Sequence, residues 1–369
     1  MDVVVTYLRG LVPGRRALFA LAIGAVCGWL AALAGMPLPW MLGPMIGNTL
    51  AAVLALPVRG PDRLRPLVIP VIGVMLGSAM SPEMFGAAGR YAASFALLLP
   101  FLGLTALVSY AVYRRLGRYD PVTAFFSAMP GGLNDMLILG GAAGGNEKRI
   151  ALAHAARVLL VILFVVLFYG YALDVTSDEV SRGTAATALA PLDWLLLGAA
   201  AVAGVPLGKL MRMPAPQIVG PMLLSGAMHV TGLVTVAPPG FLIVVAQVVI
   251  GTVIGCRFLG TTARQIGRDL SLGAVSSLAM IAVAVGFATA LTALTGIPLS
   301  LSFLGYSPGG LTEMSLLALA MGQDVAYVSV LHLVRIMLVI FAAQPVFRLT
   351  RPRSGRPAQS GAKPPRSGS

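Results

Sequence analysis

The stretch Met129-Pro130-Gly131-Gly132-Leu133-Asn134-Asp135-Met136 decides the fold, because it returns 178 positions later as Ser307-Pro308-Gly309-Gly310-Leu311-Thr312-Glu313-Met314. Both copies lie between apolar segments. Pro-Gly-Gly ends a helix, since proline lacks the N–H and clashes with the preceding turn while glycine exposes the backbone. Within a bilayer, broken backbone is tolerated only where protein buries it or where it lines a watery cavity. Two such breaks at corresponding positions of two halves are typical of a transporter's binding site.

The composition indicates an all-α polytopic membrane protein. The 369 residues are 57% hydrophobic and 11% charged, with a mean hydropathy of +0.89. Apolar segments of roughly 17–25 residues recur along almost the whole chain, each long enough to cross a hydrocarbon core of about 30 Å. The net charge of +13 comes from Lys and Arg in short loops and at the two ends, which indicates membrane topology rather than a nucleic-acid surface. No removable signal peptide is expected, because the first apolar segment is of spanning length.

Loop charges predict the topology of the first half. Arginines precede a first helix at about 17–35, follow a second helix that ends near 56, and follow a fourth helix at about 91–113, so these loops are expected in the cytoplasm. A third helix lies at about 66–81 and a sixth at about 149–172. If the first Pro-Gly-Gly segment is a re-entrant hairpin, the cations that follow it are cytoplasmic too. The first half then has five crossings and one hairpin.

The second half repeats the parts of the first in the same order. The Pro-x-Pro…Gly-Pro-Met motif at 37–45 returns at 214–222, the GxxxG pair Gly73 and Gly77 returns as Gly251 and Gly255, and a His-x-x-Arg motif also returns. The chain is therefore an internal duplication. Because five crossings is an odd number, the second half is expected to run inverted, which places its cationic loops in the cytoplasm. Parallel repeats of six crossings each would place those loops outside, so the inverted arrangement is favoured.

The expected organisation has five parts. These are a cytoplasmic N-terminus (1–16), membrane repeat 1 (17–173), a linker (174–189), membrane repeat 2 (190–348) and a disordered basic cytoplasmic tail (349–369). Together they predict about ten transmembrane helices and two re-entrant hairpins in the bacterial inner membrane, with both termini cytoplasmic. The GxxxG rows suit a homodimer and intramolecular packing equally well.

Polar residues at membrane depth are the candidates for a binding site. His154 and Arg157 are three residues apart and share a helix face, as do their second-half counterparts His332 and Arg335. An arginine inside a spanning helix costs about 2.5–3.5 kcal/mol on insertion scales, so it faces a partner or a water-filled cavity. In one interpretation the arginines and the hairpin-tip N–H groups bind a small anionic substrate. In the other, Arg157 pairs with Asp135 and Arg335 with Glu313, and the two interpretations are compatible.

The predicted substrate-binding residues are those of the two breaks and of the two His-x-x-Arg motifs. They are Pro130, Gly131, Gly132, Asn134, Asp135, His154, Arg157, Pro308, Gly309, Gly310, Thr312, Glu313, His332 and Arg335. Coupling of transport to protons or to sodium is an expectation that the sequence leaves open. His154 or His332 could carry the proton, because an unperturbed histidine titrates near pH 6.5. A structural histidine with satisfied hydrogen bonds is the more common case. Asn146 and Asp324 are expected to cap the helices that follow them, and His229 is expected to be structural.

No catalytic residue, cofactor or metal is expected. Cys27 and Cys256 lie singly in apolar segments, and the three histidines are scattered, so no ligand cluster can be recognised. The lipid bilayer is the expected partner, and direct nucleic-acid binding is not expected, since the chain offers no soluble basic module.

The Pro-Gly-Gly-Leu pair, the Pro-x-Pro…Gly-Pro-Met pair and the duplicated His-x-x-Arg resemble the bacterial membrane family named AbrB, over about residues 15–348. The resemblance implies a duplicated integral membrane protein, labelled in the family as a regulator of gene expression or as an ammonia monooxygenase. The architecture is also similar to citrate- and glutamate-type secondary transporters, although fold alone does not fix function. The sequence predicts a carrier of a small anionic metabolite working by alternating access. The alternative is a membrane-embedded regulator that acts on gene expression indirectly, without transport.

Overall fold

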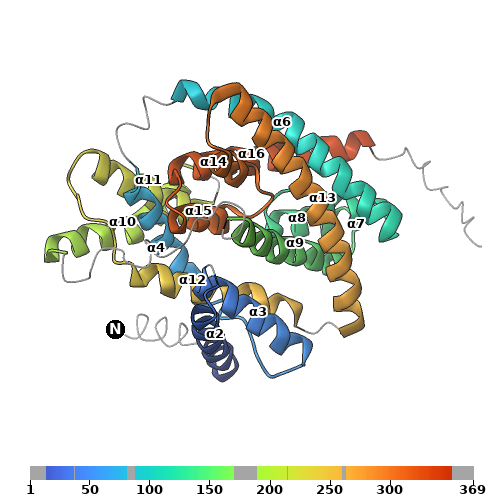
Figure 1. Cartoon of the computed structure of the whole chain (residues 1–369), viewed down its shortest axis with the longest axis horizontal. Coiled ribbons are helices and arrows are strands. Elements are labelled where there is room, and N and C mark those ends of the chain that lie inside the picture. The colour runs from blue at the N-terminus through green and yellow to red at the C-terminus, as the bar shows by residue number, and fades with distance from the viewer. Residues whose placement is uncertain are drawn as a thin grey trace, which may run out of the picture.

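The structure is a computed structural model, described here for residues 14–36, 38–80, 88–169, 189–213, 215–259 and 263–350. The described residues form helices and no strand (Figure 1). The first half contains α2 (Arg15–Leu33), α3 (Pro39–Val53), α4 (Arg65–Ser78), α6 (Ala88–Ala111) with a π-helical end (Val112–Leu116), α7 (Pro121–Ala128), α8 (Leu133–Ala142) and α9 (Glu147–Leu167). The second half contains α10 (Pro191–Leu210), α11 (Pro216–Val230), α12 (Phe241–Gly255) with a 3₁₀ end (Cys256–Phe258), α13 (Ala263–Thr295), α14 (Leu299–Tyr306), α15 (Leu311–Ala320) and α16 (Val325–Thr350). Most of the predicted linker and tail lies outside the described residues.

The order of helices in the first half returns in the second. Each helix from α2 to α9 has a counterpart among α10 to α16, and the packing between the halves is reciprocal. Helix α4 lies against α11 while its counterpart α12 lies against α3, and α9 lies against α13 while α16 lies against α6. In Figure 1, α9, α14 and α15 lie in the middle of the molecule, between α10 and α11 on one side and α6 and α13 on the other.

The GxxxG rows are used inside the chain. A Cβ added to Gly73 of α4 would lie 2.5 Å from the carbonyl oxygen of Ile218 in α11, and one added to Gly251 of α12 would lie 2.5 Å from the carbonyl oxygen of Met41 in α3. A helix can approach another backbone this closely only where its own residue at the contact is a glycine, which has no side chain. These rows therefore hold the two halves of one chain together.

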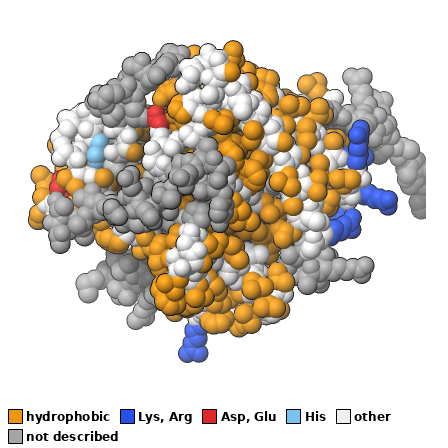
Figure 2. Space-filling view, in the orientation of Figure 1, with side chains coloured by type: hydrophobic (Ala, Val, Ile, Leu, Met, Phe, Trp, Pro, Cys, Tyr) orange, Lys and Arg blue, Asp and Glu red, His pale blue; other side chains and the backbone are white. Residues whose placement is uncertain are grey.

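Seven of the described helices are long and apolar enough to cross a membrane: α2, the segment Tyr91–Leu116, α9, α10, the segment Phe241–Phe258, Gly267–Thr295 and Val325–Phe347. Helices α3, α4 and α11 have only 14 or 15 residues, or roughly 21–23 Å, which is shorter than a spanning helix. The described helices of spanning length are therefore fewer than the ten expected. Helices α3 and α11 start late, because Leu38 and Ala215 precede the first turn in the left-handed region. Hydrophobic side chains make up much of the described surface in Figure 2, with few charged side chains among them. The helices are those of a multi-pass membrane protein.

Both Pro-Gly-Gly segments interrupt a helix, as predicted. Helix α7 ends at Ala128 and α8 begins at Leu133, while α14 ends at Tyr306 and α15 begins at Leu311. The outer ends of each interrupted segment come together. The backbone N–H of Asn146, after α8, donates to Thr123 Oγ1 in α7 at 2.8 Å. Ser300 Oγ in α14 donates to Gln323 Oε1, after α15, at 3.1 Å.

The turns that follow α8 and α15 end in helix caps, which confirms the prediction for both residues. The Asn146 side chain accepts a hydrogen bond from the Arg149 N–H at 3.0 Å, and Asp324 Oδ1 accepts one from the Tyr327 N–H at 2.9 Å. Each cap satisfies a free N–H of the first helical turn. The caps fix where α9 and α16 begin, and hence the register of the histidine and arginine on each helix.

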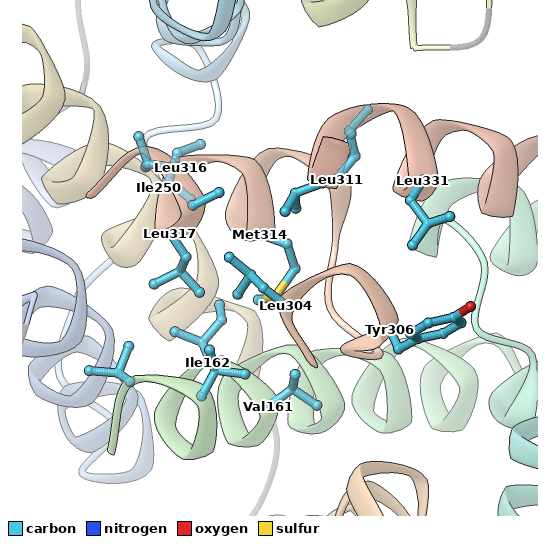
Figure 3. Packing of buried hydrophobic residues seen from close by; sticks show 14 of the residues in the cluster. Val161, Ile162, Ile250, Leu304, Tyr306, Leu311, Met314, Leu316, Leu317 and Leu331 are labelled. Atoms are coloured by element: carbon cyan, nitrogen blue, oxygen red, sulfur yellow. The ribbon is translucent and has the colours of Figure 1, made fainter. Parts of the chain in front are cut away.

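The largest apolar core surrounds the second interrupted segment (Figure 3). Leu304 of α14 and Met314 of α15 lie side by side, and Ile162 of α9 packs near them from the first half. Leu317 of α15 lies in the same core, toward Ile250 of α12. The second break is thus embedded among helices from both halves of the chain.

Candidate functional site

Arg157 on α9 and Arg335 on α16 each bind the backbone of one break. Arg157 donates from Nη1 to the Met129 carbonyl oxygen at 2.9 Å and from Nη2 to the Gly131 carbonyl oxygen at 3.2 Å. Arg335 repeats this arrangement in the second half. It donates from Nη1 to the Ser307 carbonyl oxygen at 2.6 Å and from Nη2 to that of Gly309. The two side chains are only 5% and 2% exposed.

The carbonyl groups at a helix end explain these contacts. The last turn of a helix has carbonyl oxygens without helical N–H partners, and its end carries partial negative charge, so a cation is favoured there. The planar guanidinium group presents two parallel donors and can bridge the carbonyls on both sides of the proline. Each arginine therefore holds its break in place as a fork.

His154 and His332 replace a hydrogen bond that proline removes. The Phe126 carbonyl of α7 would accept from the N–H of residue 130 in a continuous helix, and Pro130 has none. His154 Nε2 lies 2.9 Å from this oxygen, and His332 Nε2 lies 3.1 Å from the corresponding Leu304 oxygen in α14. A carbonyl only accepts, so Nε2 carries the hydrogen in both. The Nδ1 atoms are buried and have no partner among the described residues.

The ion pairs considered from the sequence are absent. Within the described part of the chain, neither Arg157 nor Arg335 forms an ion pair with Asp135 or Glu313, because the Nη groups of both arginines bond to backbone carbonyls. The carboxylates instead fold back over their own helix starts. A Cβ on Gly132 would lie 2.6 Å from Asp135 Oδ2, and one on Gly310 would collide with Glu313 Oε2. A carboxylate in the first turn of a helix is favoured by the helix dipole.

The two breaks line one cavity of about 490 Å³. Of the fourteen residues predicted from the sequence, eleven line it: Pro130, Gly131, Gly132, Asp135, His154, Arg157, Gly309, Gly310, Thr312, Glu313 and Arg335. Pro308 and His332 do not line it. The side chain of Asn134 lies outside what the structure describes. The structure thus brings most of the predicted site residues of both halves to one place.

Sequence reasoning missed part of the cavity wall. Arg65 at the start of α4, Arg257 just after α12, and Gln217 in the first turn of α11 also line it. From the sequence, both arginines are recognisable only as loop cations that indicate topology. Arg65 carried one usable signal, because a positive charge in the first turn opposes the helix dipole.

The remaining polar candidates lie apart from the cavity. His229 Nδ1 contacts the Ser225 carbonyl oxygen of its own helix at 2.8 Å, which agrees with a structural role. Cys27 is partly buried and Cys256 is buried, and neither is in a disulfide. Among the described residues, no three His, Cys, Asp or Glu side chains come close enough together to hold a metal ion.

Comparison with known proteins gives one family and two relatives. A family model described as "Transition state regulatory protein AbrB" matches residues 40–351. "Uncharacterized protein YhjN" of Bacillus subtilis (strain 168) is 29% identical over 357 residues, which cover 90% of this chain and 92% of the relative. "Putative regulator AbrB" of Escherichia coli (strain K12) is 24% identical over 316 residues, which cover 85% of this chain and 90% of the relative.

Proposed function

The chain belongs to the AbrB family, and from its fold and cavity we propose that it is a secondary transporter that moves a small anionic metabolite across the bacterial inner membrane by alternating access. One observation carries the proposal: the breaks of both halves line a single cavity that also contains four arginines, Arg65, Arg157, Arg257 and Arg335. Interrupted helices that meet at a cavity are how transporters bind ions and small solutes inside a membrane. No catalytic role is proposed.

The shape of each interrupted segment supports a re-entrant hairpin. Helices α7 and α8 have 8 and 10 residues, or roughly 12 and 15 Å, well short of a hydrocarbon core of about 30 Å. The hydrogen bond from Asn146 to Thr123 joins the start of α7 to the turn after α8, and that from Ser300 to Gln323 joins the start of α14 to the turn after α15. In this proposal each segment enters and leaves on the same side of the membrane.

The charges around the hairpins support inverted halves. The turn after α8 is followed by Lys148 and Arg149, whereas residues 295–300, from the end of α13 into the first turn of α14, carry no charge. If cations mark the cytoplasm, the first hairpin opens there and the second opens on the outer side. Adding the short helices α3, α4 and α11 to the seven long ones gives ten crossings. Both termini are then cytoplasmic.

Proton coupling, where it occurs, would use His154 rather than His332. His154 lines the cavity and has a free Nδ1 atom, whereas His332 lies outside the cavity wall. Sodium coupling is the other mode that the experiment must include. The asymmetry between the two histidines gives the proposal a residue-specific test.

The experiment is uptake into proteoliposomes. Small carboxylates are screened under an imposed proton gradient and, separately, a sodium gradient, with wild type beside His154→Gln and His332→Gln. Gradient-driven uptake by the wild type supports the carrier. Proton-driven uptake that is lost in His154→Gln alone supports the assigned coupling. Folded wild-type protein that takes up none of the carboxylates under either gradient contradicts the proposal.

A regulatory function is the second candidate, because the family description and the name of the E. coli relative both refer to regulation. Such a protein would affect gene expression indirectly, through a partner or a metabolite, and not by binding DNA. Transcript levels in a deletion strain complemented by wild type or by a variant without uptake separate the two. A regulator that needs no transport restores the transcript pattern in both strains.

A further inference from the structure

We propose that Arg65 and Arg257 are the anion-binding pair of the cavity, that the anion they bind is a dianion, and that this pair serves one face of the protein only. The inference rests on the proposed function, since it names the substrate class of the same cavity. The sequence predicts Arg157 and Arg335 as the arginines that bind the anion, and the proposal gives this role to Arg65 and Arg257 instead.

Free hydrogen-bond donors distinguish the two pairs of arginines. Each Nη group of Arg157 and Arg335 donates one hydrogen bond to a backbone carbonyl, which fixes both side chains, and their buried Nε atoms have no partner among the described residues. Arg65 and Arg257 are half-buried and line the same cavity. Neither forms a hydrogen bond or a close ion pair with a described residue, although Arg257 is attracted by Glu313 and Asp62 and repelled by Arg65. Their guanidinium groups are therefore the ones in the cavity that are not bound to backbone.

Local structure does not account for Arg65. It is the first residue of α4, where the partial positive charge of the helix end disfavours a cation. Its side chain nevertheless remains half-buried against the cavity. An anion between Arg65 and Arg257 would offset both the unfavourable dipole and the repulsion between the arginines.

Charge balance sets the class of ligand. The cavity wall holds four guanidinium groups and two carboxylates, Asp135 and Glu313, which leaves two positive charges in excess. Uncompensated charge in a partly buried site is costly, so a ligand with two negative charges is favoured over a monoanion. Guanidinium groups bind carboxylates through paired N–H···O bonds. Ile69, Ile254 and Ile336 also line the cavity and suit a short carbon chain between two carboxylates.

The pair exists in one half-site only. At the repeat offset of 178 positions, the counterpart of Arg65 is Ile243 and the counterpart of Arg257 is Ala79. If the halves exchange roles when the carrier reopens on the other side, the corresponding cavity lacks these two charges. The dianion would then bind more tightly from the face that carries Arg65 and Arg257.

The test is binding of succinate, with sulfate as a second dianion and butyrate as a monoanion, to the purified full chain by calorimetry. We expect Arg65→Gln and Arg257→Gln each to weaken succinate binding by about tenfold to a hundredfold, the usual effect of losing a hydrogen bond between charged groups. Arg63→Gln is the matched control, since Arg63 is exposed and does not line the cavity. Thermal unfolding of each variant verifies that it is folded, and Arg65→Lys and Arg257→Lys should keep part of the affinity.

Three results would overturn the inference: binding of neither dianion to folded wild type, equal affinity for succinate and butyrate, or no loss of affinity in Arg65→Gln and Arg257→Gln. Uptake measurements separate it from the proposed function. Succinate binding that depends on both arginines, without any flux, rejects transport and leaves the binding pair. Flux of a monoanion that is unchanged in both glutamine variants keeps transport and rejects the binding pair.

Discussion

His154 donates from Nε2 to the carbonyl oxygen of Phe126 at 2.9 Å, and so makes the hydrogen bond that the helix loses at Pro130. His332 and Leu304 stand in the same relationship 178 positions later. The histidine of each His-x-x-Arg motif is thus paired with the proline of the break in the same half. The motif and the break form one structural unit, although 20 or more residues separate them in the chain.

Replacing either histidine should destabilise the protein. His154→Ala leaves the Phe126 carbonyl buried without a donor, which costs about 1–3 kcal/mol, and His332→Ala should cost a similar amount. The measurement is the midpoint of thermal unfolding in detergent. His229→Ala is the control, because His229 is only partly buried and bonds mainly to its own helix. Equal midpoints for all three variants would show that the bonds to Phe126 and Leu304 are unimportant.

Lysine should not replace either fork arginine. An ammonium group is a single point of charge and cannot bridge two carbonyls as the guanidinium fork does. We expect Arg157→Lys and Arg335→Lys to speed hydrogen exchange at Gly131–Leu133 and Gly309–Leu311, respectively, by about tenfold or more, the loss of one charged hydrogen bond. Arg268→Lys is the control, since Arg268 makes one bond to a backbone carbonyl elsewhere. Unchanged hydrogen exchange at both breaks would show that the two arginines do not hold the breaks in place.

The elements around the breaks could be predicted from the sequence because local chemistry determines them. Pro130 and Pro308 end helices wherever they occur in one, and Asn146 and Asp324 are caps by side-chain type. The spacing of three residues placed His154 and Arg157 on one face without any knowledge of the fold.

The partners of those residues could not be predicted in the same way. A sequence displays carboxylates but not unpaired carbonyls, so it offers Asp135 or a bound anion as the partner of Arg157 and gives no sign of the helix end at Met129. Arg65 and Arg257 were missed because they reach the cavity only through the packing of α4 and α12 against the other half. Fewer helices reach spanning length than the ten expected, in part because α3 and α11 begin only after the left-handed residues Leu38 and Ala215.

Alanine should be poorly tolerated where the halves touch. Gly73→Ala and Gly251→Ala place a methyl group against a facing backbone carbonyl and should cost about 1–3 kcal/mol through overpacking. Gly286→Ala in α13 has open space around it and should instead stabilise its helix by up to about 1 kcal/mol. Thermal unfolding of the three variants gives the comparison. Contact glycines that behave like Gly286 would mean that the observed approach of the helices is not required.

The open end, or mouth, of each hairpin is where the start of its first helix meets the turn after its second helix. The two mouths should be labelled from opposite sides of the membrane. In a variant without Cys27 and Cys256, Glu147→Cys lies beside the first mouth and Pro298→Cys beside the second, and both positions are exposed. An impermeant maleimide added to intact cells should label the cysteine at 298 but not the one at 147, and inside-out vesicles should reverse this result. Labelling of both cysteines from the same side would contradict inverted halves and support parallel ones.

The reciprocal contact of α4 with α11 and of α12 with α3 also constrains the order of assembly. A ribosome completes the first half before it begins α11, so Gly73 and Gly77 have no partner backbone while that half waits in the bilayer. Only the arrival of the second half closes both glycine rows, each on the other half's Gly-Pro helix. Folding therefore resembles the association of two subunits, except that the second one is synthesised later on the same polypeptide.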